Sequence, residues 1–439
     1  MIGMLKGTGK RECNKLSLIP YTYMARCGIS FERYRGAMNM SMLFEPIDIG
    51  PLTIKNRFVR SATYEAMASE NGEVTEELIR LYRNLAKGQA GLIIAGYSYV
   101  LPSGKCMKHE TGLHDDAMIA GWKRLVDAVH DEGGTIAIQL VHGGIQSLKE
   151  KGTRSIRGPT GGIRNSVNFG KSSEMTDSEI RETIEAFGAA ASRAISAGVD
   201  AIQIHAAHGY LASEFLSPFF NRREDSWGGS DENRFKFLKE VILAVKNGLP
   251  SEKALLIKLN AADHVKGGGI TPELALVYAR WLADLGIDGL ELSCGTTFFS
   301  PFNMCRGNIP YDDLSRKFPK WQRPLVKSIM KQMFKSRALE GEYNMDAAKI
   351  IKPVLGKVPL ILVGGVRSVA RMESIIREGH ADMVSMCRPF VREPFLVKDI
   401  KDGKIDAVTC TSCNRCFAAV FNEIPLACYA KGLPGKMKK

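Results

Sequence analysis

The chain has 439 residues, of which 45% are hydrophobic, and its mean hydropathy is −0.10. These values are ordinary for a globular protein, and the sequence has no apolar run of the roughly 18 residues that a membrane span needs. The formal net charge of +13 comes from basic residues spread along the chain, with local density only at the two ends. We therefore expect neither nucleic acid nor a membrane as a partner.

The first 40 residues carry seven lysines and arginines but only two glutamates. They lack the continuous apolar segment of a secretory signal, so we interpret residues 1–41 as a disordered or non-native extension, with a transit peptide as the alternative. The chain has ten cysteines and no secretory signal, which indicates a reducing compartment. We expect a cytoplasmic protein, and we leave open whether it forms a homo-oligomer.

Short apolar segments then alternate with segments of helical periodicity. The apolar segments are near-continuous, which is typical of parallel strands covered on both faces. They span residues 57–63, 91–97, 135–141, 201–205, 255–260, 289–293, 360–364 and 381–386. The helical segments span residues 75–87, 117–131, 177–197, 231–247, 272–285, 345–355 and 368–378.

This alternation predicts an α/β protein, a (β/α)8 TIM barrel over residues 42–405, with a short cysteine-rich tail over residues 406–439. A doubly wound sheet is the alternative, but the first strand ends in Ser61-Ala62-Thr63-Tyr64 and not in a glycine-rich fingerprint. Two connections are long, residues 142–175 and residues 294–344. Both follow strand C-terminal ends, so we expect them to lie over the active face of the barrel.

Polar residues occur at several predicted strand ends. Gln139 lies near the end of the third strand, and Lys258 interrupts the apolar fifth strand, where a buried lysine needs a counter-charge or a ligand. Gly364 and Gly365 follow the seventh strand and Arg388 follows the eighth. The loops after these two strands form the usual phosphate site of this fold, so the sequence predicts an anion there.

The fourth strand is followed by the densest group of polar side chains. His205, His208 and Tyr210 place two imidazoles and a phenol at one strand end, where they can hold a carbonyl oxygen and supply a proton. A phenol has a reference pKa of about 10, so Tyr210 is protonated at neutral pH. A structural role for the histidines is one alternative. A metal site is another, but no carboxylate or cysteine lies nearby in sequence to complete it.

The tail contains a cysteine cluster with the spacing C-x2-C-x2-C-x11-C. Its members are Cys410, Cys413, Cys416 and Cys428. Thiolates at such spacing suit an iron–sulfur cluster or zinc, and unligated thiols are the third interpretation.

Residues 43 to about 400 resemble the old yellow enzyme family, flavin-dependent reductases on a TIM barrel. The resemblance rests on Leu43-Phe44-Glu45-Pro46, on Lys55-Asn56-Arg57 and above all on the segment from His205 to Arg234. It implies FMN as cofactor and NADH or NADPH as electron donor. It also implies that the flavin is bound by Ala62, Thr63, Tyr64, Gly96, Gln139, Lys258, Gly364, Gly365, Cys387 and Arg388.

By the same resemblance, His205 and His208 bind a substrate carbonyl and Tyr210 donates a proton. The implied reaction is ene-reduction, the transfer of hydride from reduced flavin to an enone or enoate. Three positions depart from the family's common pattern: Ile145 and Lys258 stand where arginine is frequent, and Cys387 where glycine is frequent. These departures put the fine geometry of the cofactor in doubt but not its identity.

The tail is similar to that of the 2,4-dienoyl-CoA reductase and trimethylamine dehydrogenase branch, which carries a [4Fe–4S] site after its barrel. That branch usually has three residues between its second and third cysteines, whereas here only Asn414 and Arg415 separate them. Two alternative functions follow. One is a flavin dehydrogenase or demethylase that passes electrons to an iron–sulfur cluster, and the other is a non-catalytic flavin redox carrier.

Overall fold

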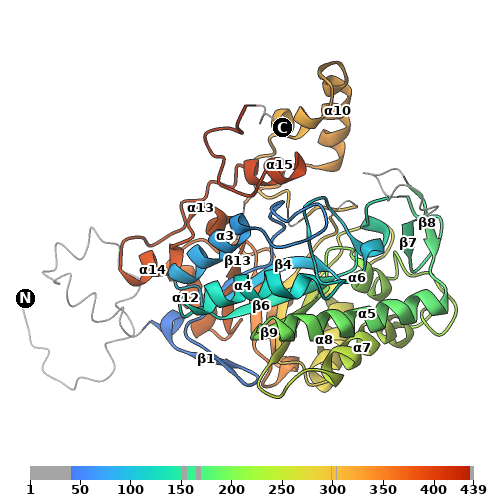
Figure 1. Ribbon diagram of the computed structural model, residues 1–439, viewed down its shortest axis with the longest axis horizontal. Coiled ribbons are helices and arrows are strands. Elements are labelled where there is room, and N and C mark those ends of the chain that lie inside the picture. Colours follow the sequence, from blue (N-terminus) through green and yellow to red (C-terminus); the bar gives the residue numbers. More distant parts are fainter. Residues whose placement is uncertain are drawn as a thin grey trace, which may run out of the picture.

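A computed structural model describes residues 41–149, 156–164, 170–297, 299–302, 304–339 and 341–435. All but the last residue of the expected N-terminal extension, residues 1–41, lies outside these ranges. The predicted TIM barrel is confirmed (Figure 1). Its strands are β3 (Phe58–Arg60), β4 (Leu92–Tyr99), β6 (Ile136–Val141), β9 (Ala201–Ala206), β10 (Ala254–Asn260), β11 (Gly289–Ser293), β12 (Leu360–Val363) and β13 (Met383–Met386).

These strands pair in parallel around a closed ring, in which β13 pairs with β3 and β3 with β4. Every residue of these strands is buried except Tyr97, which is partly exposed. Burial on both faces explains why the sequence shows continuous apolar runs and no alternation. A two-residue strand, β5 (Thr111–Gly112), adds to the end of β4.

Helices cover the outside of the barrel: α3 (Glu76–Lys87), α4 (Met118–His130), α5 (Asp177–Ser196), α7 (Asp231–Asn247), α8 (Pro272–Asp284), α11 (Met345–Ile351), α12 (Val369–Arg377) and α14 (Leu396–Lys401). Side-chain oxygens cap the start of several of them. Thr176 caps α5 in a capping box with Glu179, and Thr271 caps α8 ahead of Pro272. These caps satisfy backbone N–H groups that the first helical turn leaves free.

An antiparallel hairpin closes one end of the barrel. It consists of β1 (Ile47–Ile49) and β2 (Leu52–Ile54), and neither strand was predicted from the sequence. Ile49 and Ile54 pack against Val59, Leu92 and other residues in the first halves of the barrel strands. Because this end is filled with aliphatic side chains, the site must lie at the opposite end, where the strands terminate.

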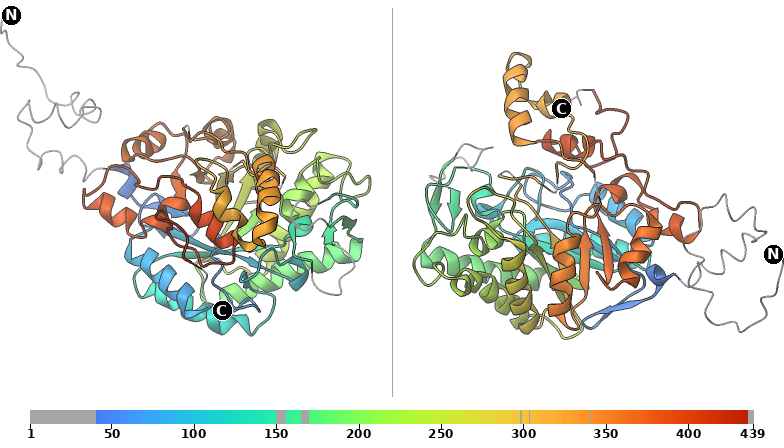
Figure 2. Two further views of the ribbon diagram at one scale, coloured as in Figure 1. Left: turned by 90° about the horizontal axis from the view of Figure 1, so that it is seen from above. Right: turned by 180° about the vertical axis from the view of Figure 1, so that it is seen from behind.

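The two long connections lie at that opposite end. The first contains the short parallel strands β7 (Ile156–Gly158) and β8 (Ser172–Glu174). The second contains α9 (Tyr311–Leu314) and α10 (Arg323–Met333), which stand on top of the barrel beside the tail helix α15 (Arg415–Phe421) (Figures 1 and 2). Leu314, Met330, Phe334, Ala418 and Phe421 form a small separate core there. The tail is therefore packed onto the insertion after β11.

Candidate active site

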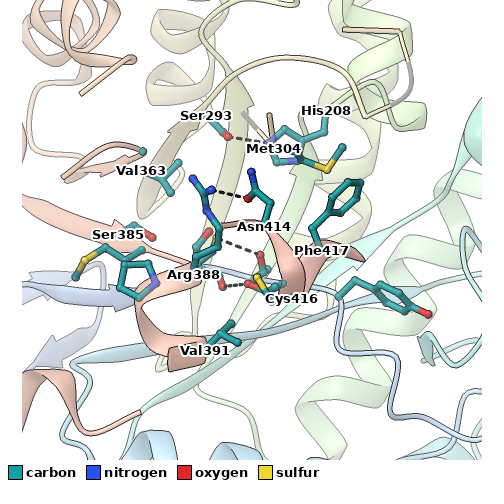
Figure 3. Close-up of a pocket in the computed structure, with 18 of the residues that line it drawn as sticks. His208, Ser293, Met304, Val363, Ser385, Arg388, Val391, Asn414, Cys416 and Phe417 are labelled. Atoms are coloured by element: carbon teal, nitrogen blue, oxygen red, sulfur yellow. Dashed lines mark hydrogen bonds between the residues drawn. The ribbon is translucent and has the colours of Figure 1, made fainter. Parts of the chain in front are cut away.

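A large cavity opens where the barrel strands end (Figure 3). Its empty volume is about 1560 Å³, which includes open solvent at its mouth. Residues from the barrel, from the insertion after β11 and from the tail line it together. Ten of them were predicted from the sequence as catalytic or flavin-binding residues: Ala62, Thr63, Tyr64, His208, Tyr210, Lys258, Gly364, Gly365, Cys387 and Arg388. Cys416, predicted as a metal ligand, also lines the cavity.

Three of the predicted catalytic and flavin-binding residues are not among those that line the cavity. Gln139 is buried and donates from Nε2 to Gln203 Oε1 at 2.6 Å. His205 is 2% exposed and packs behind His208 and Tyr210. Gly96 lies within β4, and its N–H donates to Tyr82 Oη at 3.1 Å. Gln139 and Gly96 are therefore positioned to support the cavity wall, whereas His205 packs directly against the rings of His208 and Tyr210, which line the cavity.

The structure brings His205, His208 and Tyr210 together. The ring centroids of His205 and His208 are 4.9 Å apart with the rings nearly perpendicular, and those of His205 and Tyr210 are also 4.9 Å apart. His205 is the penultimate residue of β9, Tyr210 directly precedes α6 (Leu211–Leu216), and His208 lies in the loop between them. A tight strand-to-helix turn thus presents the three polar rings as one group.

Both imidazoles are held in the neutral form. Burial is the main cause that takes the pKa of His205 and of His208 well below the usual value, and the nearby Lys258 cation adds to it. His205 Nδ1 accepts the N–H of Ala207 at 3.3 Å, so the hydrogen of its neutral ring is on Nε2. Neutral imidazoles can donate to a carbonyl oxygen without the cost of burying a charge.

The His208 side chain is fixed by its surroundings. Its backbone adopts φ +63°, uncommon for a residue other than glycine, and its N–H donates to Asn260 Oδ1 at 3.1 Å. Ser293 Oγ at the end of β11 lies 2.7 Å from His208 Nε2 (Figure 3). If Ser293 donates this hydrogen bond, the free hydrogen is on His208 Nδ1. A strained backbone held from several sides is typical of a preorganised site.

Sequence reasoning missed Tyr97, which sits against the proposed proton donor. Tyr210 Oη donates to Tyr97 Oη at 3.0 Å, and the two ring centroids are 5.2 Å apart. Tyr97 also stacks on Tyr64, with centroids 6.2 Å apart. Burial raises the pKa of Tyr97 and of Tyr210 well above the usual value for a phenol, so both keep their protons. Sequence analysis did not identify Tyr97 because it lies within an apolar strand, where an aromatic residue is expected.

A second missed group is the buried carboxyl of Glu110, 1% exposed. Its Oε2 accepts the N–H groups of Cys106 and Met107 at 2.7 and 2.9 Å, while Oε1 has no partner among the described residues. Burial raises the pKa of Glu110 to about 8, so the group is mostly a neutral acid at pH 7. Glu110 therefore holds the loop through which Cys106 and Met107 reach the cavity.

Lys258 has the counter-charge that a buried lysine requires. Its Nζ lies 3.3 Å from Glu291 Oε2 and donates to Ser61 Oγ at 2.7 Å. Ser385 donates to the other Glu291 oxygen, and Gln203 donates to Oε2. The ion pair that sequence analysis offered as an alternative is therefore present, yet Lys258 also lines the cavity. Lys258 is therefore both ion-paired inside the barrel and available to a ligand, the two interpretations that the sequence left open.

The far side of the cavity is built from the ends of β12 and β13. Gly364 and Gly365 adopt φ +111° and +83°, and a Cβ at Gly365 would lie 2.0 Å from Gly341 O. Only glycine fits this close backbone approach. Arg367 and Arg388 also line the cavity here, and neither pairs with a carboxylate among the residues described. Two such guanidinium groups beside glycine backbone suit a phosphate.

The second half of the polar segment after β9 has a structural role. Asn221 donates to Phe215 O and Trp227 O, and the buried Arg223 donates to Pro159 O and Met175 O. Arg223 also pairs with Asp225, while Trp227 Nε1 donates to Asp177 at the start of α5. These contacts tie the segment to the first long connection, which explains its polar composition.

The four tail cysteines line one small pocket beneath Arg388 and Arg392. Arg392 Nη1 donates to Cys428 Sγ at 3.6 Å. Within the described part of the chain, no three His, Cys, Asp or Glu side chains are close enough together to hold a single metal ion. The thiols thus share a pocket, but they do not form the tight tetrahedron that zinc needs.

Comparison with known proteins gives consistent results. A model of the NADH:flavin oxidoreductase / NADH oxidase family matches residues 42–297 and 311–407. A 4,4'-dithiodibutanoate disulfide reductase of Rhodococcus erythropolis is 31% identical over 86% of this chain and 93% of its own length. An NADPH dehydrogenase of Bacillus subtilis strain 168 is 33% identical over 81% of this chain and 93% of its own.

Among solved structures, a 2-naphthoyl-CoA reductase in complex with 2-naphthoyl-CoA superimposes with a TM-score of 0.73 and 27% identity. The match covers 88% of this chain but 56% of the reductase, so the chain spans little more than half the length of that protein.

Proposed function

The chain belongs to the NADH:flavin oxidoreductase / NADH oxidase family and is an FMN-dependent enzyme that uses NADH or NADPH, and from that premise we propose that it reduces an alkene conjugated to a carbonyl. The single observation that carries the proposal is the convergence of His205, His208 and Tyr210 at the end of β9. The reaction needs two hydrogen-bond donors for a carbonyl oxygen and one acid for the neighbouring carbon, and this group supplies them.

The residues present fit FMN. Ala62, Thr63 and Tyr64 form one wall of the cavity and Lys258 provides a cation for the ring edge. Gly365 and Arg388 provide backbone and charge for the phosphate. When bound, FMN supplies the hydride that it has taken from NAD(P)H. We assign Gln139 and Gly96 to the support of this wall, since both are buried behind it.

In our proposal, His205 Nε2–H and the free N–H of His208 donate to the substrate carbonyl oxygen. They stabilise the negative charge that develops there as hydride reaches the β carbon, and each donor is worth on the order of 3 kcal/mol in such sites. Tyr210 gives its phenolic proton to the α carbon. Tyr97 Oη, 3.0 Å from Tyr210 Oη, is placed to return a proton to it.

The test is turnover of cyclohexenone with NADH and NADPH by the wild type and by the double variant His205→Ala, His208→Ala. We expect the double variant to keep FMN and its reduction by NAD(P)H but to lose enone reduction and the binding of phenols, which mimic an enolate oxygen. Equal phenol binding by the two proteins would reject the histidines as the carbonyl clamp.

A second proposal concerns the tail, where we assign Cys410, Cys413, Cys416 and Cys428 as ligands of a [4Fe–4S] cluster. Support comes from their shared pocket and from its lining by the cations Arg388 and Arg392, which suit the net negative charge of a cluster with four thiolates. A cluster is larger than a single ion, so thiols too far apart for zinc are compatible with it. When bound, the cluster supplies one-electron transfer next to the flavin site.

Iron and acid-labile sulfide in protein purified without oxygen test this assignment. We expect about four of each per chain, and Cys413→Ala should abolish them and loosen the tail, because thiolate ligation couples metal binding to local folding. A metal-free preparation that keeps full enone reduction would contradict the assignment and leave the flavin proposal intact.

A further inference from the structure

The insertion after β11 carries the most exposed apolar side chains of the described residues. Trp321 is 80% exposed, Leu325 68% and Ile329 41%. The remaining exposed large hydrophobic residues are all below half exposed and lie on other elements. Trp321 belongs to the single turn that leads into α10, so the three residues follow one another at intervals of four and form one stripe along the helix, called here the exposed stripe.

The exposed stripe is presented by a firmly packed helix. On a neighbouring face of α10, Met330 is buried and Val326 and Met333 are partly buried against the small core shared with the tail. Rotation of α10 about its axis therefore cannot bury the exposed stripe without exposing this second apolar face. Figures 1 and 2 show α10 projecting from the barrel beside α15, far from α7.

The same segment is rich in basic residues. Residues 315–337 contain eight lysines and arginines and no aspartate or glutamate. Lys327 pairs with Asp312, whereas no described carboxylate pairs with Lys320, Lys331 or Lys335. Lys320, Lys331 and Lys335 therefore give the exposed side of this segment a positive charge that no described carboxylate neutralises.

We propose that this segment docks the protein onto the surface of an anionic lipid bilayer. A helix with basic residues on one face and Trp and Leu on another lies in the plane of the membrane interface, with its apolar side chains in the headgroup region and its lysines on lipid phosphates. Tryptophan favours that depth. No described helix is long and apolar enough to cross a membrane, so the contact is peripheral. It departs from the sequence prediction of no membrane partner.

The charge of the segment favours an anionic bilayer over a second copy of the chain as the partner of the exposed stripe. Two copies joined through the exposed stripe would bring the same unpaired lysines together with no acidic residue of residues 315–337 between them. A bilayer supplies both requirements at once, anionic groups and an apolar layer directly below. The docked helix would lie at the end of the barrel where Phe417, Val420 and Phe421 of α15 line the cavity, so that apolar substrates could enter from the lipid.

The experiment is co-sedimentation of the FMN-loaded protein with vesicles of phosphatidylcholine alone and with vesicles of equal parts phosphatidylcholine and phosphatidylglycerol. We expect binding to the anionic vesicles only, weakened by salt. The double variant Trp321→Ser, Leu325→Ser should bind at least about tenfold more weakly. Lys331→Gln with Lys335→Gln should have a similar effect, since each lysine near an anionic surface is worth roughly fivefold in affinity.

The matched control is Leu243→Ser, which removes a 45% exposed leucine from α7 and should bind like the wild type. All variants should keep their flavin and their NAD(P)H oxidation, so failure of vesicle binding is separable from failure of the proposed enzyme activity. Wild type that ignores anionic vesicles, or a Trp321 and Leu325 variant that binds as well as wild type, overturns the proposal. If the protein binds polyglutamate but not vesicles, the proposal is overturned and the partner is an acidic protein. If the wild type forms a dimer that the Trp321→Ser, Leu325→Ser variant does not form, the proposal is overturned and the exposed stripe is a self-association surface.

Discussion

Tyr210 is the residue whose proposed role is easiest to isolate. Replacing it with phenylalanine removes the phenol and its hydrogen bond to Tyr97 but keeps the buried ring. We expect the FMN content and the rate of flavin reduction by NAD(P)H to be unchanged. Enone reduction should be slowed by about 10²–10⁴-fold, the usual loss for a general acid. Rapid mixing of the reduced enzyme with cyclohexenone measures this directly. Unchanged turnover would mean that the proton comes from elsewhere.

Tyr97 should act through Tyr210. Tyr97→Phe leaves the Tyr210 hydroxyl without its partner, so the phenol is less well oriented and less easily reprotonated. We predict a fall in enone reduction of roughly fivefold with phenol binding to His205 and His208 retained, since an oriented hydrogen bond is worth about 1 kcal/mol. A Tyr97→Phe variant with the pH profile and rate of wild type would show that Tyr97 only fills space.

Glu110 makes stability depend on pH. Its pKa is raised from 4.5 to about 8 by burial, so between these values the unfolded chain releases a proton that the folded protein keeps. Its contribution is complete below pH 4.5 and is lost as pH rises through 8, a change on the order of 5 kcal/mol. Glu110→Gln keeps acceptors for Cys106 and Met107 but cannot ionise. Denaturant midpoints from pH 5 to 9 should therefore fall less steeply in the variant, and identical slopes would contradict this.

At the scale of elements, the side chain of Asn414 is one of the contacts that join the tail to the proposed phosphate site. Asn414 is 1% exposed, accepts from Arg388 Nη1 at 2.6 Å and donates to Arg306 O and Asn308 O. Its backbone is left-handed, with φ +55°, which glycine adopts without strain. Asn414→Gly therefore removes the three hydrogen bonds without distorting the loop.

We expect Asn414→Gly to weaken FMN retention by about tenfold or more, because Arg388 loses the partner that orients it. Fluorescence titration of the apoprotein with FMN measures the effect. Asn308→Ala is the control, since it removes an exposed side chain but leaves the Asn308 carbonyl that Asn414 contacts. Equal FMN affinity of the two variants would show that the tail does not support the phosphate site.

The elements that the sequence predicted well are those with long, uniform burial patterns. All eight barrel strands were found because each is an apolar run buried on both faces, such as Leu255 to Leu259. The hairpin β1–β2 was missed because its two strands have three residues each, and residues such as Thr53 and Asp48 face outward. Helices α10 and α15 belong to a core formed by segments about 100 residues apart, which a local pattern cannot reveal.

The site residues that the sequence predicted are likewise those with a local signal, and those it missed depend on tertiary packing. His208, Tyr210 and Lys258 were found because polar side chains at the ends of apolar strands are conspicuous. Tyr97 and Phe417 were missed because an aromatic residue in an apolar run looks like core until the fold shows the space beside it. The pocket shared by the cysteines also depends on tertiary packing, because Arg388 and Arg392 reach it from another part of the chain.

At the scale of the whole molecule, one end of the barrel is closed by aliphatic packing and the other carries every element of the proposed function. The proposed flavin cavity, the cysteine pocket, the tail helix α15 and the basic helix α10 all lie at the open end. This arrangement suits the proposed cycle, in which NAD(P)H and the substrate occupy the same cavity in turn.

The measurement that tests the central claim most directly is an anaerobic flavin titration. The visible band of the purified protein should show oxidised FMN, should bleach when NADH or NADPH is added, and should return when cyclohexenone follows in the absence of oxygen. The return of the band should be lost in Tyr210→Phe and in the His205→Ala, His208→Ala variant, while bleaching is kept. A protein that binds FMN and is reduced by NAD(P)H, but whose flavin stays reduced with the enone present, would contradict the proposed reaction.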